Sequence, residues 1–275
     1  MKKFIQFSGV IVLMVMFSTN IHGENNNEDT MTMEFSDPSR PGLLKVSGGK
    51  GDVTINGYNG KEVIIKTILE IENLTSLPKH KKAKGLKRIS GTKLNVAIVE
   101  DENTIVISRS LKDKIEMFIQ VPFKTSLKSV GGIFEGNIEV KNISGEIEIN
   151  TSVSSITLLD ISGEAAVNTI TGKIVVTFKD INREKPMYFS AVDGYIDVTF
   201  PPDTQANLTI KNVDGDVFTD FEIDLTSKPK VEKKKTSSGR ANIRPGNNIT
   251  GKINGGGPEI QLITVTGNIY VRKGE

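Results

Sequence analysis

The chain has 275 residues, with 35 Lys and Arg against 33 Asp and Glu, 26 Gly and no Cys. The absence of Cys excludes thiol redox chemistry, thiolate metal ligands and a lipid anchor attached to cysteine. The apolar residues are mostly Ile and Val, whose branched side chains suit a pleated sheet, and helical periodicity is confined to the first twenty residues. We therefore expect an all-β protein.

Residues 1–23 have the pattern of a secretory signal peptide. Lys2 and Lys3 precede an apolar run, Val10–Phe17, that is too short to span a bilayer, and Gly23 offers a small residue for cleavage. Removing two Lys leaves 33 basic residues against 33 acidic ones. We expect an exported protein, in the periplasm, at the cell surface or secreted, with no membrane span after cleavage. Its neutral charge argues against a nucleic-acid partner.

Residues 24–42 are polar and rich in turn residues, and we interpret them as a leader into a first strand at Leu43. Alternating apolar residues then predict a series of short strands. Asn56-Gly57 has the composition of a tight hairpin turn. The expected strands before the central repeat cover residues 43–46, 51–55, 63–67, 94–99, 104–108 and 115–121.

Between residues 136 and 176 the sequence repeats every nine residues, as a turn residue followed by an alternating strand. A single unit of this kind cannot bury its apolar face alone, so the repeat predicts stacked units. Two columns of each unit lie on the same strand face and should form the core. These columns are Ile138, Ile147, Ile156, Ala165, Ile174 and Val140, Ile149, Leu158, Val167, Val176.

The same strand recurs at longer intervals, starting at Gly172, Gly194 and Gly215, and returns near the end in residues 259–263 and 267–271. This spacing predicts a flattened β-solenoid with two strands per coil, each coil stacked on its neighbour about 4.8 Å away. We expect one solenoid domain over residues 43–273. Two irregular basic insertions, 79–93 and 226–250, leave its side.

The opening residues 37–46, the segment 51–58, the iterated Gly-x-Ile-x-Val and the closing residues 253–271 resemble a large bacterial family. Its members are exported β-solenoids known as putative adhesins, of unknown function and common in Bacteroidota. The resemblance covers roughly residues 34–273. It implies a fold and an exported location, and it supplies no catalytic or binding residues.

Acidic residues are the candidates for catalysis, because parallel β-helices host polysaccharide-acting enzymes. Glu139 and Glu148 occupy the same repeat column, and Asp193 and Asp214 each precede a coil-starting Gly. The column does not continue as acids, and Asp-Gly is ordinary turn chemistry. We predict that the protein is not an enzyme and has no catalytic residues.

We also predict no metal and no cofactor. The segment Gly48–Asp52 resembles the calcium-binding nonapeptide of β-rolls, but it occurs once and has a different spacing. A structural turn is the favoured interpretation.

Two basic runs are candidates for contact with an anionic surface, either lipid headgroups or acidic glycans. The alternative is that they are solvated insertion loops. They would form one patch if both left the same side of the solenoid. The residues are Lys79, Lys81, Lys82, Lys84, Lys87, Arg88, Lys233, Lys234 and Lys235.

The sequence thus favours an exported, non-enzymatic β-solenoid that presents a surface for adhesion or for binding an envelope protein or glycan. One alternative is a periplasmic scaffold or regulatory partner in envelope homeostasis. A weaker alternative is a polysaccharide-acting enzyme. The oligomeric state does not follow from the sequence.

Overall fold

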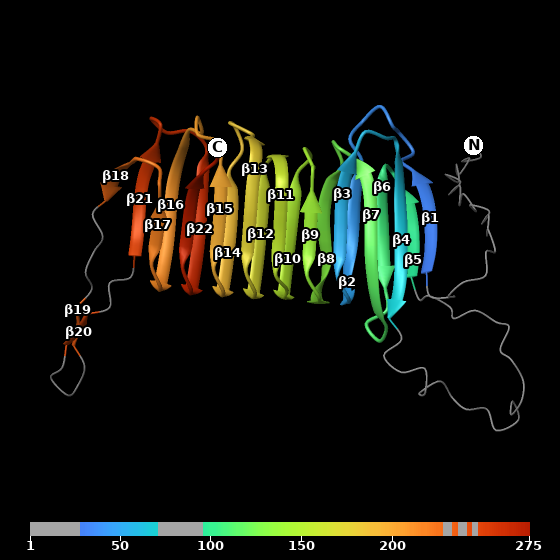
Figure 1. The fold of residues 1–275 in the computed structure, drawn as a ribbon, viewed down its shortest axis with the longest axis horizontal. Helices are drawn as coiled ribbons and strands as arrows, with labels where there is room; N and C mark the ends of the chain where they lie inside the picture. The colour runs from blue at the N-terminus through green and yellow to red at the C-terminus, as the bar shows by residue number, and fades with distance from the viewer. Residues whose placement is uncertain (1–27, 71–95, 228–232, 236–240, 244–246) are drawn as a thin grey trace, which may run out of the picture.

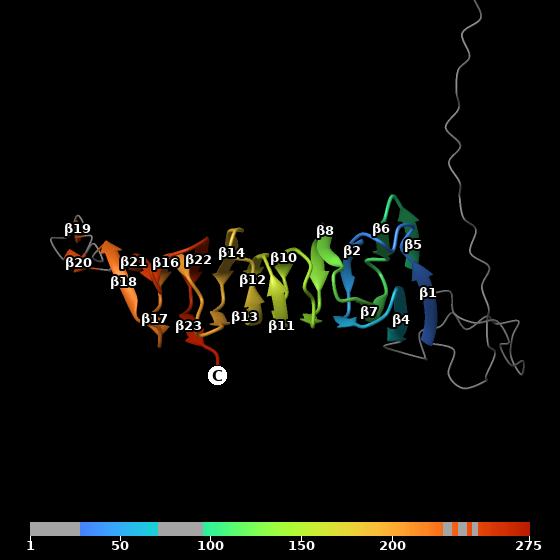
Figure 2. The ribbon, with the colours of Figure 1, turned by 90° about the horizontal axis from the view of Figure 1, so that it is seen from above.

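The computed structural model describes residues 28–70, 96–227, 233–235, 241–243 and 247–275. One continuous 21-stranded sheet winds into two facing layers, with the apolar core between them (Figures 1 and 2). The expected all-β solenoid is confirmed. The predicted signal peptide and the first basic insertion lie outside the described residues.

The strand pairings define the order of strands in each layer along the solenoid axis. The first layer contains β5 (Val96–Asp101), β6 (Thr104–Arg109), β2 (Leu43–Lys50), β8 (Ser126–Glu135), β10 (Ile147–Val153), β12 (Ala165–Thr171), β14 (Met187–Asp193), β22 (Glu259–Thr266), β16 (Ala206–Asp214), β21 (Asn247–Ile253) and β18 (Ile223–Ser227). The second layer contains β1 (Glu28–Glu34), β4 (Glu62–Glu70), β7 (Lys114–Pro122), β3 (Val53–Tyr58), β9 (Ile138–Lys141), β11 (Ile156–Gly163), β13 (Ile174–Ile181), β15 (Ile196–Phe200), β23 (Ile269–Lys273) and β17 (Val217–Thr219).

The coils stack on one another as expected, but they do not stack in chain order. The last coil, β22 with β23, lies between β14–β15 and β16–β17. At the other end, the first coil, β2 with β3, lies between β6–β7 and β8–β9. Every such coil offers the same parallel backbone ladder and the same inward apolar residues, so local pattern alone does not fix the order.

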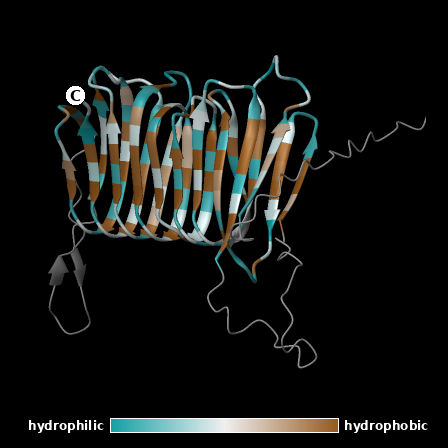
Figure 3. Cartoon of the chain, turned by 45° about the vertical axis from the view of Figure 1, so that its right-hand side comes forward, coloured by the Kyte–Doolittle hydropathy of each residue, from teal (hydrophilic) through white to brown (hydrophobic). Residues whose placement is uncertain are grey.

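The two predicted core columns are confirmed. All ten residues are at most 4% exposed, and they face inward from β9, β10, β11, β12 and β13. Figure 3 shows the same alternation of apolar and polar residues along the strands. The nine-residue unit is therefore half a coil, because successive units lie in opposite layers.

The coil-starting glycines are required by the close approach of adjacent corners. Gly194 has φ +152°, and a Cβ there would lie 2.0 Å from the carbonyl oxygen of Gly172. Gly267 has φ +128°, and its Cβ would lie 2.3 Å from the carbonyl oxygen of Gly194. A side chain would push the coils apart, so these corners need glycine.

Three further expectations need correction. Asn56-Gly57 is not a hairpin turn: it lies inside β3, and a Cβ on Gly57 would meet the carbonyl oxygen of Asn142. The leader contains a strand, β1, which pairs antiparallel with β4. The second insertion is not irregular throughout, because β21 begins within it and pairs antiparallel with both β16 and β18. Strands β19 (Lys233–Lys235) and β20 (Ala241–Ile243) also form a ladder there.

A buried arginine holds the corner where the first coil is inserted. Arg109 Nη1 donates hydrogen bonds to the carbonyl oxygens of Lys50 (3.2 Å), Gly51 (3.0 Å) and Ile115 (2.9 Å). The guanidinium also lies 5.6 Å from the ring centroid of Phe134. Burial lowers the pKa of Arg109 to about 10, so the group stays charged at neutral pH. The carbonyl oxygens of Gly49, Lys50 and Gly51 thus surround this side chain, and Gly48–Lys50 lie inside β2 rather than in a turn.

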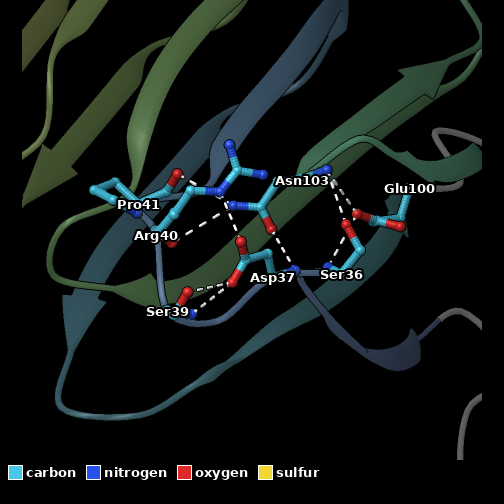
Figure 4. A network of polar contacts seen from close by, with 7 residues as sticks. All are labelled: Ser36, Asp37, Ser39, Arg40, Pro41, Glu100 and Asn103. Carbon is cyan, nitrogen blue, oxygen red and sulfur yellow. Dashed lines mark hydrogen bonds and ion pairs between the residues drawn. The ribbon is translucent and has the colours of Figure 1, made fainter.

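A polar network ties the segment after β1 to the β5–β6 turn (Figure 4). The buried Asn103 accepts a hydrogen bond from the Asp37 backbone N–H (2.8 Å) and donates to the Pro41 carbonyl oxygen (3.2 Å). The Asp37 carboxylate accepts hydrogen bonds from Ser39 and from Arg40 Nε (2.7 Å). These hydrogen bonds lower the pKa of Asp37.

The interleaved order makes a direct prediction for engineered disulfides, since the chain has no native Cys. Thr199 and Arg272 are register partners on β15 and β23, so the pair Thr199→Cys with Arg272→Cys should oxidise readily. If the coils stacked in chain order, Thr199 would instead pair with Asp220. The pair Thr199→Cys with Asp220→Cys should therefore remain reduced, as measured by peptide mass spectrometry. Efficient oxidation of the second pair and not the first would disprove the interleaving.

The Asp37 network predicts a pH-dependent contribution to stability. The pKa of Asp37 in the folded state is below the ordinary value of 3.8, so its stabilising effect is present above that pH. The effect is lost as the pH falls through the lower folded-state pKa. Thermal unfolding should show Asp37→Asn less stable than wild type at pH 7, with the gap closing as the pH falls below 3.8 and through the lower folded-state pKa. A gap that is constant over this range would contradict the assignment.

Candidate binding surface

The side chains of the predicted basic residues lie outside the described part of the chain. Lys79 to Arg88 lie in residues 71–95, outside the described part of the chain. Lys233, Lys234 and Lys235 form β19, for which only the backbone is described. The strands that flank the two insertions, β4 and β5 for one and β18 and β21 for the other, lie at opposite ends of the solenoid (Figure 1). The single basic patch therefore stays a prediction.

The predicted acidic candidates are also separated. Glu139 lies on β9 and Glu148 on β10, so they project from opposite layers. Each pairs with a lysine: Glu139 with Lys141 (2.7 Å) and Glu148 with Lys128 (2.6 Å). Within the described ranges, no group of three or more His, Asp or Glu is arranged to hold a metal ion. Nor do those ranges contain a helix long and apolar enough to cross a membrane.

An exposed aliphatic ridge runs along one corner of the solenoid. Each residue of the ridge lies near the end of its strand, two positions before a coil-starting Gly. These strand ends form the lower edge of the molecule in Figure 1. The registers of β12 with β14, β14 with β22 and β22 with β16 place the four ridge residues side by side on adjacent strands. Each is between 42% and 60% exposed. In order along the axis, the ridge consists of Ile170, Val192, Val265 and Val213.

The alternation of the strands explains why these residues point outward. Thr264 precedes Val265 and is fully buried, where its hydroxyl donates to the carbonyl oxygen of Gly194 at 3.1 Å. Thr169 precedes Ile170 and is also fully buried, donating to the carbonyl oxygen of Ser154 at 3.1 Å. Ala191 and Asn212 are buried at the equivalent positions before Val192 and Val213. Because successive side chains of a strand point to opposite faces, the residue after each of these buried positions faces solvent.

An aromatic cluster lies on the other side of the same corner glycines. It consists of Tyr195, Tyr270 and Phe218, from the segments that begin the second-layer strands β15, β23 and β17. The Phe218 and Tyr270 rings stack with centroids 5.2 Å apart and an interplanar angle of 12°. The Tyr195 ring meets Tyr270 edge-on at 6.3 Å. Tyr195 is 37% exposed and Phe218 49%.

Charged and polar side chains hold the cluster in place. Arg272 donates to both carboxylate oxygens of Asp197 (2.7 and 3.0 Å), and its guanidinium lies 5.2 Å from the Tyr270 ring centroid. The hydrogen bonds to Asp197 raise the pKa of Arg272. Asn268 Nδ2 donates to the Tyr270 hydroxyl at 3.0 Å. The cluster is therefore ordered before any partner arrives, which lowers the entropy cost of binding.

The sequence analysis missed both features, although a signal for the ridge was present. An Ile or Val precedes Thr-Gly or Asp-Gly at four places, residues 170–172, 192–194, 213–215 and 265–267. Only the Asp-Gly part was interpreted, as turn chemistry. No sequence signal could have found the cluster, because Tyr270 joins Tyr195 and Phe218 only through the interleaved coil order.

These features define an all-β solenoid with an exposed apolar and aromatic corner. Residues 149–272 match the family model described as Toastrack DUF4097. The match covers the ridge and the cluster, and the resemblance drawn from the sequence is confirmed over this region. A comparison with curated proteins found no match.

Several solved structures are similar to this chain. A putative cell adhesion protein from Clostridium sporogenes is 15% identical, with 90% of this chain and 99% of that one covered and a TM-score of 0.43. A putative adhesin from Bacteroides fragilis is 11% identical, with 90% and 98% covered and a TM-score of 0.35. A putative lipid binding protein from Parabacteroides distasonis is 12% identical, with 91% and 98% covered and a TM-score of 0.27.

The exposure of the ridge predicts that it contributes little to folding. Val213→Thr, at a position that is 60% exposed, should change the free energy of unfolding by less than about 0.5 kcal/mol. Val271→Thr places the same hydroxyl at a position with no exposure and should cost about 1–3 kcal/mol. Urea unfolding of both variants provides the comparison. Equal losses would mean that the ridge is packed against another part of the protein.

Proposed function

We propose that this protein is an exported, non-enzymatic binding protein that uses the solenoid corner to attach to an envelope or extracellular component. One observation carries the proposal: the aliphatic ridge and the aromatic cluster flank the same corner glycines and are both exposed. Contiguous exposed apolar side chains on a folded domain are typical of interaction sites. A rigid, preorganised sheet surface suits binding rather than turnover.

The non-enzymatic part of the proposal is supported by the placement of the acidic candidates. Glu139 and Glu148 project from opposite layers, so they cannot act on one glycosidic bond. Asp193 and Asp214 contribute backbone carbonyl oxygens to the corner, accepting from Gly172 and Gly267 N–H groups. Incubation with a panel of polysaccharides should release no new reducing ends and no unsaturated products. Release of either would overturn this part.

Export is proposed from the signal-peptide pattern of residues 1–23. Protease added to intact cells should degrade the protein if it is displayed at the surface. Protection until the outer membrane is opened would place it in the periplasm, with an envelope partner there.

Binding is tested with charge substitutions in the ridge. Purified protein is immobilised, and capture of isolated envelope fragments from the source bacterium is measured. The double variant Val192→Lys with Val265→Lys should capture at least about tenfold less, because a charge desolvated against an apolar partner is costly. Both positions are exposed, and circular dichroism with thermal unfolding checks that the fold is kept.

The matched control is the double variant Val99→Lys with Leu111→Lys, at positions that are 59% and 57% exposed near the far end of the solenoid. This variant should capture envelope fragments as well as wild type. The proposal is wrong if the ridge variant captures as much as the control, or if both lose capture equally.

A further inference from the structure

The strip between the ridge and the aromatic cluster carries negative charge. Asp193 and Asp214 lie directly before the corner glycines, and Asp216 lies directly after one of them. All three are exposed, and none forms an ion pair with another described residue. Their neighbours across the interleaved coil are the uncharged Thr266 and Asn268.

The positive groups nearby either are already engaged or lie at the border of the strip. Arg272 is paired with Asp197, as described above. Lys211 lies on the far side of the ridge, two residues before Val213, and Lys173 lies beside the position of Tyr195 on the neighbouring coil. The strip therefore carries three carboxylates against a single cation, Lys173, which directly follows Gly172 at one end of the strip.

The aromatic rings favour the same sign of partner charge. The face of an aromatic ring attracts Lys and Arg, and Arg272 already uses Tyr270 in this way at 5.2 Å. Phe218 and Tyr195 remain partly exposed beside it. The carboxylates and the ring faces thus both favour a cation. The ridge offers an apolar contact on the other side of the strip.

We propose that this corner binds a cationic polypeptide segment that also carries apolar side chains. Its Lys or Arg groups lie along the acidic strip and over the exposed rings, and its apolar side chains pack on the ridge. Asp193 and Asp214 are two strand spacings apart, about 9.6 Å, which three residues of an extended chain can span. This inference names the partner chemistry of the proposed binding surface and rests on that function.

The same charges disfavour an anionic partner at this corner. Phosphate groups, acidic glycans and anionic lipid headgroups would meet three unpaired carboxylates. The contact with anionic surfaces predicted for the basic insertions would therefore have to occur elsewhere on the molecule.

The test uses the purified protein and fluorescent peptides of known composition. An eight-residue peptide of alternating Lys and Val should bind, and its affinity should fall as salt is added. Peptides of alternating Glu and Val or of alternating Lys and Ser should bind much more weakly, because each lacks one of the two contacts. Vesicles rich in anionic lipid serve as the competing partner class, and their binding should not depend on the corner.

The decisive variant is the triple substitution Asp193→Asn, Asp214→Asn and Asp216→Asn. It should weaken binding of the Lys–Val peptide about tenfold, since each exposed ion pair contributes a modest free energy. The control triple, Glu62→Gln, Asp101→Asn and Glu116→Gln, changes net charge equally at the other end of the solenoid and should leave the affinity unchanged.

The outcomes separate this inference from the proposed function. Equal affinity of both triple variants, or no peptide binding by wild type, overturns the cationic partner. If the ridge lysines still abolish capture of envelope fragments in that case, the corner binds a partner of another chemistry. If the acidic strip is required for both the peptide and the fragments, both proposals are supported.

Discussion

The close approach of coils at the corner is the constraint on which the rest of the structure depends. Parallel strands about 4.8 Å apart leave no room for a Cβ where each coil turns between layers. At Gly194 that atom would lie 2.0 Å from the carbonyl oxygen of the next coil. The glycines therefore fix the register of every coil against its neighbours. Side chains at a given distance from the glycine then form straight columns along the axis, some buried and some exposed.

The ends of the solenoid solve a different problem, which is how to stop a stack of parallel strands. Each parallel edge could accept a further strand from another molecule. Here antiparallel strands follow the last parallel strand at three of the four layer ends: β5, then β4 with β1, and β21 with β18. The second layer ends at the other side with the short parallel strand β17. The first and last coils are inserted one position inward. Arg109 fixes this insertion at the first end, where its buried Nη1 group donates to three backbone carbonyl oxygens.

The sequence was sufficient for the local structure and the core, because the nine-residue period shows directly which columns face inward. Ile138 and Val140 follow from alternation alone. The coil order could not be predicted, since by pattern the strand at residues 269–273 fits between β15 and β17 as well as it fits beyond β17 in chain order. Asn56-Gly57 was misinterpreted because the sequence does not distinguish two uses of glycine. One allows close approach of a neighbouring strand's backbone, as at Gly57, and the other allows the chain to turn. The candidate surface was missed for a related reason. Val192 and Val213 precede Asp-Gly, and this pair explains a turn without any role for the exposed valine.

The interleaving matters for function as well as for stability. With the coils in chain order, Tyr195 and Phe218 would lie on adjacent strands, and Tyr270 would lie outside them. Insertion of the last coil instead places Tyr270 between the two, brings Arg272 to Asp197 and sets Val265 between Val192 and Val213. It also adds no acid to the strip, because Thr266 and Asn268 take the positions that Asp193 and Asp216 occupy on the flanking coils. The inserted coil thus completes both apolar features and spaces the carboxylates apart, which reduces their mutual repulsion and leaves room for a cation between them.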